Sequence, residues 1–169
     1  MIEIRLATAS DIPLIQCIAE ETWPVTFGEI LSSEQIRYML DWMYSSEMLQ
    51  KHLTEEGHVF LLAWDSQQDR AVGFAGIQHA VKGQLTKIHK LYILPNQQGK
   101  GVGTKLIKSI QEMACAAQDE ALYLNVNKYN IQAIKFYEYI GFKEIAQEVI
   151  DIGNGYVMDD FVLGMSLVC

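Results

Sequence analysis

Three alternate glycines, Gly99, Gly101 and Gly103, follow an apolar segment, residues 91–94, that ends at Pro95. A strand that passes through such a turn into a helix exposes backbone N–H groups that have no acceptor within the helix. These donors and the helix dipole favour an anion, and the missing Cβ atoms let a ligand approach closely. The segment therefore predicts a site for a phosphate or pyrophosphate. A glycine-rich helix entrance without a ligand is the alternative.

Counting excludes two common glycine motifs. A P-loop has Gly-Lys-Ser/Thr after four spacers, but the fifth position after Gly99 is Thr104. A dinucleotide fingerprint that starts at Gly99 or Gly101 would have to end in glycine, and the chain has Thr104 or Leu106 there. The pattern that remains, over residues 98–103, is Gln/Arg-x-x-Gly-x-Gly/Ala.

A second segment, residues 130–142, contains the pattern Asn-x-x-Ala-x-x-Phe-Tyr-x-x-x-Gly-Phe. Asn130 is a good N-cap, because its side-chain oxygen can accept from an early helix N–H. Ala133 keeps the helix thin where a ligand could lie. Gly141 can adopt the left-handed conformation that ends a helix and turns the chain into Phe142.

Together the two segments resemble the GCN5-related N-acetyltransferases (the GNAT superfamily), which bind acetyl-CoA. The resemblance covers residues 85–142, about a third of the chain, and the segments occur in the family's order. It implies one α+β domain over residues 1–169, with a mixed central sheet of about seven strands and helices on both faces. The parallel strands at 85–94 and 121–126 are expected to splay apart and hold the pantetheine arm of the coenzyme.

The resemblance also implies which residues bind the acetyl-CoA cosubstrate. Backbone groups of Leu91, Tyr92 and Ile93 are expected to bond the acetyl carbonyl and pantetheine as an added strand would. Asn130 and Ala133 are expected to line the opposite wall. The residues expected to hold the pyrophosphate are Gln98, Gly99, Lys100, Gly101, Val102, Gly103 and Thr104.

Tyr137 is the residue that we expect to act in catalysis as well as to contact the coenzyme. Attack of an amine on a thioester expels a thiolate, and a phenol near the sulfur can protonate it. The family assigns that role to the tyrosine of the Phe-Tyr pair; the alternative is a core aromatic side chain. Many relatives have a base on the fourth strand, where this chain offers His89, expected on the same side as Leu91 and Ile93. A packed or exposed histidine is the alternative.

Short segments at 21–27, 89–95, 124–127 and 158–161 resemble the PaiA-type branch, which is associated with spermidine and spermine N-acetylation in bacteria. Carboxylates and aromatic faces both favour amines, so we expect the acceptor to contact Glu21, Trp23 and Phe27. One acid of the pair Asp159 and Asp160 could do the same. Core packing is the alternative for the aromatic side chains.

The resemblance thus predicts transfer of the acetyl group of acetyl-CoA to a primary amine by direct attack in a ternary complex. The amine is expected to be a polyamine or another small cation. Two alternatives stay open: a protein N-terminal or lysine acetyltransferase of the same fold, and a non-catalytic acyl-CoA-binding module.

The composition limits the partners. The chain has 13 basic and 21 acidic residues, a net charge of −8, which disfavours nucleic acid and suits a cationic substrate. Acidic surfaces also keep proteins soluble. No apolar run reaches the roughly 20 residues of a membrane span, and we expect no membrane partner. The C-terminal strand could pair with a second copy of the chain to form a homodimer.

Three scattered cysteines, Cys17, Cys115 and Cys169, suggest a reducing compartment, and we expect the cytoplasm. Cys17 and Cys115 fall in helical patterns and read as small core residues. No Cys/His grouping has metal-ligand spacing, so we expect no metal site.

Hydrophobic periodicity predicts the elements that must position these residues. The first helix begins near Ser10 and is expected to break at Pro24, with a loop over 23–28. Further helices are predicted over 32–43, 47–53, 104–118 and 130–140. Strands are predicted at the N-terminus and over 59–64, 71–79, 85–94, 121–126, 142–151 and 156–168.

Overall fold

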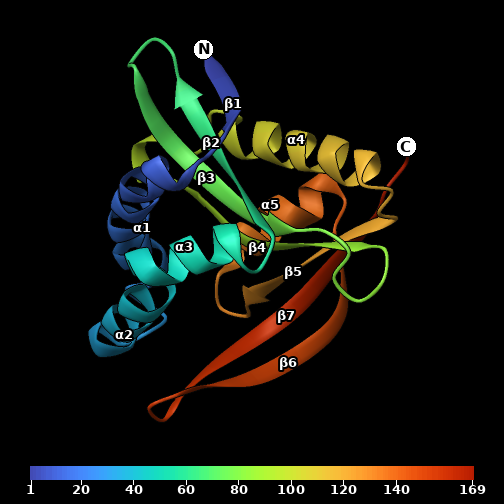
Figure 1. Cartoon of the computed structure of the whole chain (residues 1–169). Helices are drawn as coiled ribbons and strands as arrows, with labels where there is room; N and C mark the ends of the chain where they lie inside the picture. Colours follow the sequence, from blue (N-terminus) through green and yellow to red (C-terminus); the bar gives the residue numbers. More distant parts are fainter.

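The computed structural model describes residues 1–169, and its seven strands form one sheet in the order β1-β2-β3-β4-β5-β7-β6 (Figure 1). The strands are β1 (Ile2–Leu6), β2 (His58–Asp65), β3 (Arg70–Gln78), β4 (Leu85–Ile93), β5 (Ala121–Asn127), β6 (Lys143–Gly153) and β7 (Tyr156–Ser166). The helices are α1 (Ile12–Phe27), α2 (Ser33–Met43), α3 (Ser46–Thr54), α4 (Val102–Ala116) and α5 (Ile131–Ile140). Short 3₁₀ turns lie at Ala9–Asp11 and Pro95–Gln97.

The helices cover both faces of the sheet, as expected. The ring of Tyr92 on β4 lies 5.7 Å from that of Trp23 on α1. The next residue, Ile93, points to the opposite face, where it packs beside Gly103 of α4. Only β4 and β5 are parallel; all other neighbours are antiparallel. These features confirm the predicted α+β architecture and the predicted strand pair.

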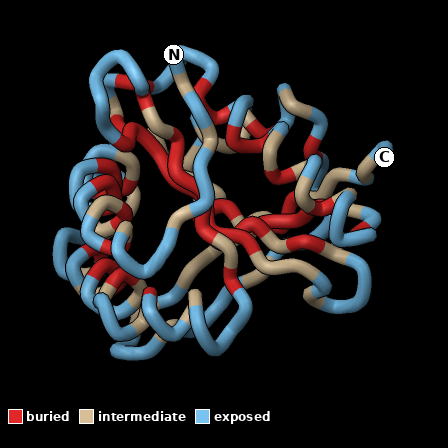
Figure 2. The backbone as a smooth tube through the Cα atoms, turned by 45° about the horizontal axis from the view of Figure 1, so that its top comes forward, coloured by how far each residue is buried: buried red, intermediate tan, exposed pale blue.

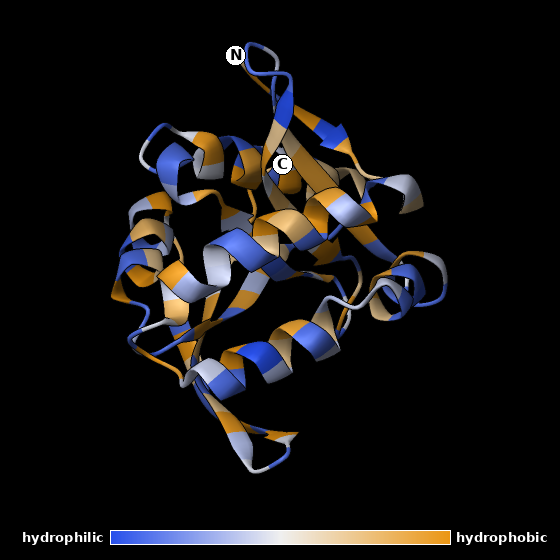
Figure 3. Ribbon diagram, turned by 90° about the vertical axis from the view of Figure 1, so that its left-hand side faces the viewer, coloured by the Kyte–Doolittle hydropathy of each residue, from blue (hydrophilic) through white to orange (hydrophobic).

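The core lies between the sheet and the two helical layers. Buried segments run along the central strands and the inner sides of the helices (Figure 2). The helices carry hydrophobic residues on one side and hydrophilic residues on the other (Figure 3). The largest fully buried side chains include Trp23, Phe60, Phe74 and Phe142. No helix combines the length and the apolar character that a bilayer span requires.

The predicted break at Pro24 is wrong, because α1 continues through Pro24 to Phe27. An interior proline costs about 3 kcal/mol. The continued helix places Trp23 and Phe27 one turn apart, with ring centroids 4.7 Å apart, and both are buried. Burying two such side chains contributes about 1.5–3 kcal/mol each. Tertiary packing therefore outweighs the local preference, and Glu20, whose carbonyl loses its usual helical donor, is exposed to solvent.

The prediction that Cys17 and Cys115 are small core residues is also wrong. Cys115, at the end of α4, forms a disulfide with Cys169, with the two Cα atoms 5.7 Å apart. Cys17 is exposed, because it lies on the outer side of α1 while Ile15 and Ile18 face the core. The sequence separation of 54 residues hides the pair, since only the packing of β7 beside β5 brings the C-terminus back to α4.

The β6–β7 hairpin extends beyond the helical layers (Figure 1). β7 lies between β5 and β6, so both of its edges are already paired. The expectation that the C-terminal strand is free to pair with a neighbour is therefore wrong. The two edge strands of the sheet are β1 and β6, and β6 is almost wholly exposed.

Candidate active site

The site begins where the parallel strands part. β4 and β5 pair only from Leu85 to Ile88 and from Ala121 to Leu124, although both strands continue further. On its other side, β4 remains paired with β3 as far as Ile93. Backbone groups of residues 91–93 that point toward β5 therefore have no strand partner, which is the geometry that an extended ligand could complete.

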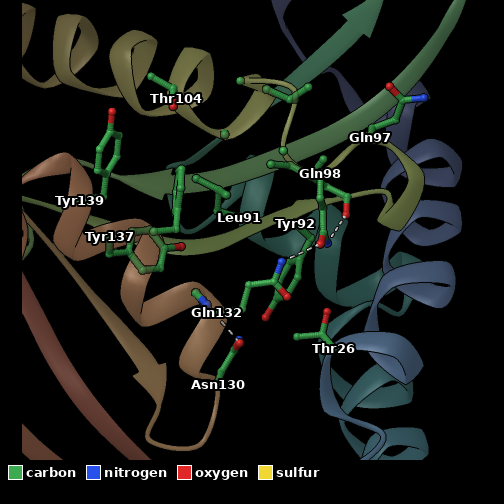
Figure 4. A pocket seen from close by; sticks show the side chains of 17 residues that line it. Thr26, Leu91, Tyr92, Gln97, Gln98, Thr104, Asn130, Gln132, Tyr137 and Tyr139 are labelled. Atoms are coloured by element: carbon green, nitrogen blue, oxygen red, sulfur yellow. Dashed lines mark hydrogen bonds between the residues drawn. The ribbon is translucent and has the colours of Figure 1, made fainter.

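A cavity of about 320 Å³ lies at this split, between β4, the start of α4 and α5 (Figure 4). The side chains of Gln98 and Gln132 meet there, with Nε2 of Gln132 donating to Oε1 of Gln98 at 3.3 Å. Every residue that the sequence analysis assigned to the coenzyme lines this cavity except Lys100, which is exposed outside it. The lining residues that the sequence analysis missed are Thr26, Gln97, Gln132, Phe136 and Tyr139.

The glycine segment has the backbone geometry of a ligand-binding loop. Gly99 and Gly101 have positive φ, +76° and +80°, and a Cβ at either would meet nothing within 4 Å. Gly101 is the N-cap of α4, so the first helical N–H groups, beginning at Val102, have no intrahelical acceptor. At Gly103 a Cβ would approach the ring of Phe136 to 2.8 Å. Gly103 thus lets α5 pack closely against α4.

α5 forms the opposite wall. Oδ1 of Asn130 accepts from the N–H of Ala133 at 3.4 Å, and Gly141 ends the helix at φ +123°, both as the sequence predicts. Tyr137 is buried, its ring 5.3 Å from Phe136 and 5.4 Å from Phe142. Burial raises the pKa of its phenol well above the usual value, so the hydroxyl stays protonated at neutral pH. In Figure 4 this hydroxyl points toward the cavity.

A second cavity, of about 220 Å³, lies on the α1 face of the sheet. It shares Leu91, Tyr92, Asn130, Ala133 and Tyr137 with the first cavity. The two cavities therefore meet at the split, with Tyr137 at their junction. A reactive group bound in one cavity could reach a ligand bound in the other.

Asp160, on β7, lines the second cavity and is fully buried. Its Oδ2 accepts a long hydrogen bond of 3.4 Å from Nδ2 of Asn125, and its Oδ1 has no hydrogen-bond partner. Burial raises the pKa of this carboxyl group. Its neighbour Asp159 instead forms an ion pair with Lys128 at 2.9 Å. Of the two acids, only Asp160 lies in the cavity, as strand alternation requires.

His89 is displaced by a bulge in β4. Gly76 pairs with Lys90 but Ile77 pairs with Ile88, which leaves His89 without a partner. The extra residue reverses the alternation, so His89 and Lys90 line the same pocket and the expected alignment of His89 with Leu91 and Ile93 does not hold.

Two features of His89 limit its basicity. Its Nε2 lies 3.0 Å from Oε1 of Gln78, and its ring stacks on His58 at 4.4 Å. Burial and the neighbouring His58 lower the pKa of His89 to about 3.

The predicted acceptor residues fall into two groups. Trp23 and Phe27 line the second cavity and are buried, with the ring of Phe27 6.5 Å from that of Tyr92. They are at once core residues and cavity walls. Glu21 is exposed on α1 and lies outside both cavities.

The sheet order, the split parallel pair and the glycine loop define the class of the protein as the N-acetyltransferase fold. The family model of the acetyltransferase (GNAT) domain matches residues 29–158, and the chain belongs to that family. It is an acetyl-CoA-dependent N-acetyltransferase.

Relatives agree with this assignment. An uncharacterised N-acetyltransferase of Mycobacterium tuberculosis is 29% identical over 157 residues, which cover 88% of this chain and 96% of that protein. The peptidyl-lysine N-acetyltransferase YjaB of Escherichia coli is 36% identical over 92 residues, 54% of this chain and 55% of that protein.

The PaiA N-acetyltransferase of Thermoplasma acidophilum, solved with coenzyme A, matches this fold with a TM-score of 0.81. The match covers 98% of this chain and 99% of that one at 23% identity, so it is a likeness of fold.

Proposed function

We propose that this acetyltransferase acetylates a primary amine whose nitrogen is held beside Asp160 in the second cavity. The observation that carries the proposal is a fully buried carboxyl group with one unpartnered oxygen, in a cavity that meets the coenzyme cavity at Tyr137. An unpaired buried charge is costly. The ammonium group of a substrate would supply the missing partner.

In this proposal the first cavity holds acetyl-CoA. The backbone edge of Leu91, Tyr92 and Ile93, which has no strand partner and where the Ile93 carbonyl accepts from Nε2 of Gln98, would bond the acetyl carbonyl and the pantetheine amides. Asn130 and Ala133 would line the far wall. Support for the diphosphate position comes from the two positive-φ glycines and the N-terminus of α4. The residues proposed to hold it are Gln98, Gly99, Lys100, Gly101, Val102, Gly103 and Thr104.

The reaction then proceeds by direct transfer. The ammonium group loses a proton to the carboxylate of Asp160, and the neutral amine attacks the acetyl carbonyl carbon. A C–N bond forms, the C–S bond breaks and the electron pair leaves on sulfur. The phenol of Tyr137 protonates the thiolate, and the second amine proton restores the phenol. The products are the N-acetyl amine and coenzyme A, with one proton released from Asp160 to solvent.

We assign the proton-accepting role to Asp160 rather than to His89. An imidazole with a pKa of about 3 is a poor acceptor for the proton of an alkylammonium, and Nε2 of His89 already bonds Gln78. A carboxyl group with a raised pKa is a better match to that proton. His89 lines the second cavity, and its Nε2 bonds Oε1 of Gln78.

For the acceptor we propose a polyamine or another small cation. The net charge of −8 and the aromatic walls of Trp23 and Phe27 support a cation. Lys87 and Lys90 also line the cavity and would repel a second ammonium group placed deep inside it. We therefore propose that one ammonium group enters while the rest of the amine lies toward the mouth.

Acetylation of protein lysine is the second candidate. The Escherichia coli relative is a peptidyl-lysine N-acetyltransferase, and a lysine side chain would also present one ammonium group on an extended stem. A thiol-release assay with acetyl-CoA would compare spermidine, spermine, diamines, free lysine and lysine peptides. Turnover of the small amines above that of the peptides supports the proposal, and turnover of peptides alone would refute it.

Replacing Asp160 is expected to impair both amine binding and turnover, because Asp160 is proposed to hold the ammonium group and to accept its proton. Asp160→Asn keeps the size of the side chain but removes the charge, so the KM for the amine should rise at least about tenfold. The affinity for acetyl-CoA, measured by calorimetry, should stay the same. Asp159→Asn is the matched control, because Asp159 pairs with Lys128 outside the cavity. Equal effects of the two variants would remove Asp160 from the acceptor site.

The remaining assignments are also proposals. We propose that residues 1–169 act as one domain, because strands from both ends of the chain join one sheet. A homodimer would use the free edge of β6. The cytoplasm is proposed from the cysteine count, and the Cys115–Cys169 disulfide, of a kind more usual in oxidising compartments, counts against it.

A further inference from the structure

Two histidines and a glutamate meet on the α1 face, near the α3–β2 turn. His52 lies in the last turn of α3, His58 begins β2, and Gly57, at φ +68°, turns the chain between them. This turn places Glu56 beside both rings: its Oε2 is 3.6 Å from Nε2 of His52 and 3.7 Å from Nε2 of His58. All three ligand atoms lie within 4.8 Å of one another.

Neither imidazole has a hydrogen-bond partner. The distances to Glu56 exceed the range of an N–H···O bond, and Nδ1 of both rings is buried without a partner. The side chain of His58 is only 5% exposed. Buried polar groups are almost always hydrogen-bonded in folded proteins. The atoms that face the carboxylate are the two Nε2 atoms, and their missing hydrogen bonds are what a ligand between the three side chains would replace.

A divalent metal ion would fit between these atoms. Zn–N and Zn–O bonds are about 2.0–2.2 Å, which places two ligands of one tetrahedral ion about 3.3–3.6 Å apart. The observed 3.6 and 3.7 Å are close to that spacing. A pocket lined by these three residues, Trp42 and Met48 opens beside them, so water has access as a fourth ligand.

We propose that His52, Glu56 and His58 form a binding site for a divalent transition-metal ion of the Zn²⁺ type. Two imidazoles and one carboxylate with an open fourth position are a ligand set that suits zinc. The pocket shares no lining residue with the coenzyme cavity.

Binding requires small local changes. The rings of His52 and His58 stack almost parallel, 4.4 Å apart at 9°, so one ring must tilt for both nitrogen atoms to point at one ion. His52 can do so, because it lies in the last turn of a short helix beside the pocket. Glu56 must also leave Lys51, whose Nζ lies 3.6 Å from its Oε1. Lys90, which lines the same pocket, is the other nearby cation.

The test is titration of tag-free protein with Zn²⁺ by calorimetry and with Co²⁺ by visible absorption. We expect one ion per chain and the d–d bands of a four-coordinate site. His52→Ala and Glu56→Gln should each weaken binding about a hundredfold or more, since ligands matter at least as much as their outer partners. These two side chains are less buried than His58, so the variants should fold, and circular dichroism would check this.

Two matched controls separate this site from others. Glu55→Gln changes the adjacent exposed acid and should leave the affinity unchanged. Cys17→Ser removes the free thiol, which could bind zinc by itself, and should also have no effect. Binding that persists in the double variant of His52 and Glu56, that disappears with Cys17, or that is absent from the unchanged protein would each overturn the proposal.

Discussion

Gly101→Val is expected to reduce the affinity for acetyl-CoA by about a hundredfold or more. At φ +80° a β-branched residue costs at least about 1–2 kcal/mol, and relief of that strain would turn the first N–H groups of α4 away from the diphosphate. Each hydrogen bond to a charged group contributes about 1.5–3 kcal/mol, and about 1.4 kcal/mol is a factor of ten. Loss of one such bond, added to the strain, gives the expected reduction. Calorimetry with acetyl-CoA measures it directly.

The matched control is Gly83→Val. Gly83 also has positive φ, +88°, and open space where a Cβ would be, but it lies in the loop before β4 and lines neither cavity. The two variants should lose similar stability in thermal melts, and only Gly101→Val should lose the coenzyme. Equal affinities in the two variants would contradict the assignment of the diphosphate to this loop.

Those parts of the fold that depend on local pattern could be predicted from the sequence. The turn at residues 95–101 and the Asn130 cap are encoded by residues that are neighbours in the chain, so their positions follow from glycine and asparagine chemistry. The split between β4 and β5 followed from the family resemblance rather than from the pattern. The family resemblance also supplied the residues assigned to the coenzyme, and nearly all of them line one cavity.

The parts that failed depend on contacts between distant segments. The bulge at His89 lies opposite Gly76 and Ile77 of β3, and nothing near His89 in the chain indicates it. Asp160 could be named as one of two acids, but its burial depends on β5 and β6 lying on either side of β7. The grouping of His52, Glu56 and His58 is local in the chain and was not predicted for a different reason, because the search for metal ligands considered cysteine and histidine but not carboxylates.

Tyr137→Phe is expected to lower kcat about a hundredfold while the affinity for acetyl-CoA stays within a factor of about two, because a general acid typically contributes 10²–10⁴-fold. The substitution removes only the hydroxyl, so the packing of the ring against Phe136 and Phe142 is kept. Stopped-flow detection of released thiol with the best amine would give kcat, and calorimetry would give the affinity.

Tyr129→Phe is the control for this effect, because Tyr129 lies just before the same helix, is 66% exposed and lines neither cavity. The raised pKa of Tyr137 makes a further distinction. A phenol that stays protonated through neutral pH can donate its proton throughout that range. A leaving thiol of lower pKa departs as a thiolate without an acid. The activity that remains in Tyr137→Phe should therefore rise when acetyl-CoA is replaced by the thioester of such a thiol. The rate with the thioester of the more acidic thiol, divided by the rate with acetyl-CoA, would be compared in the unchanged protein and in Tyr137→Phe. If this ratio is the same in both proteins, proton donation by Tyr137 does not limit the rate. An unchanged kcat would leave Tyr137 as a wall shared by the two cavities, with the thiolate protonated by solvent.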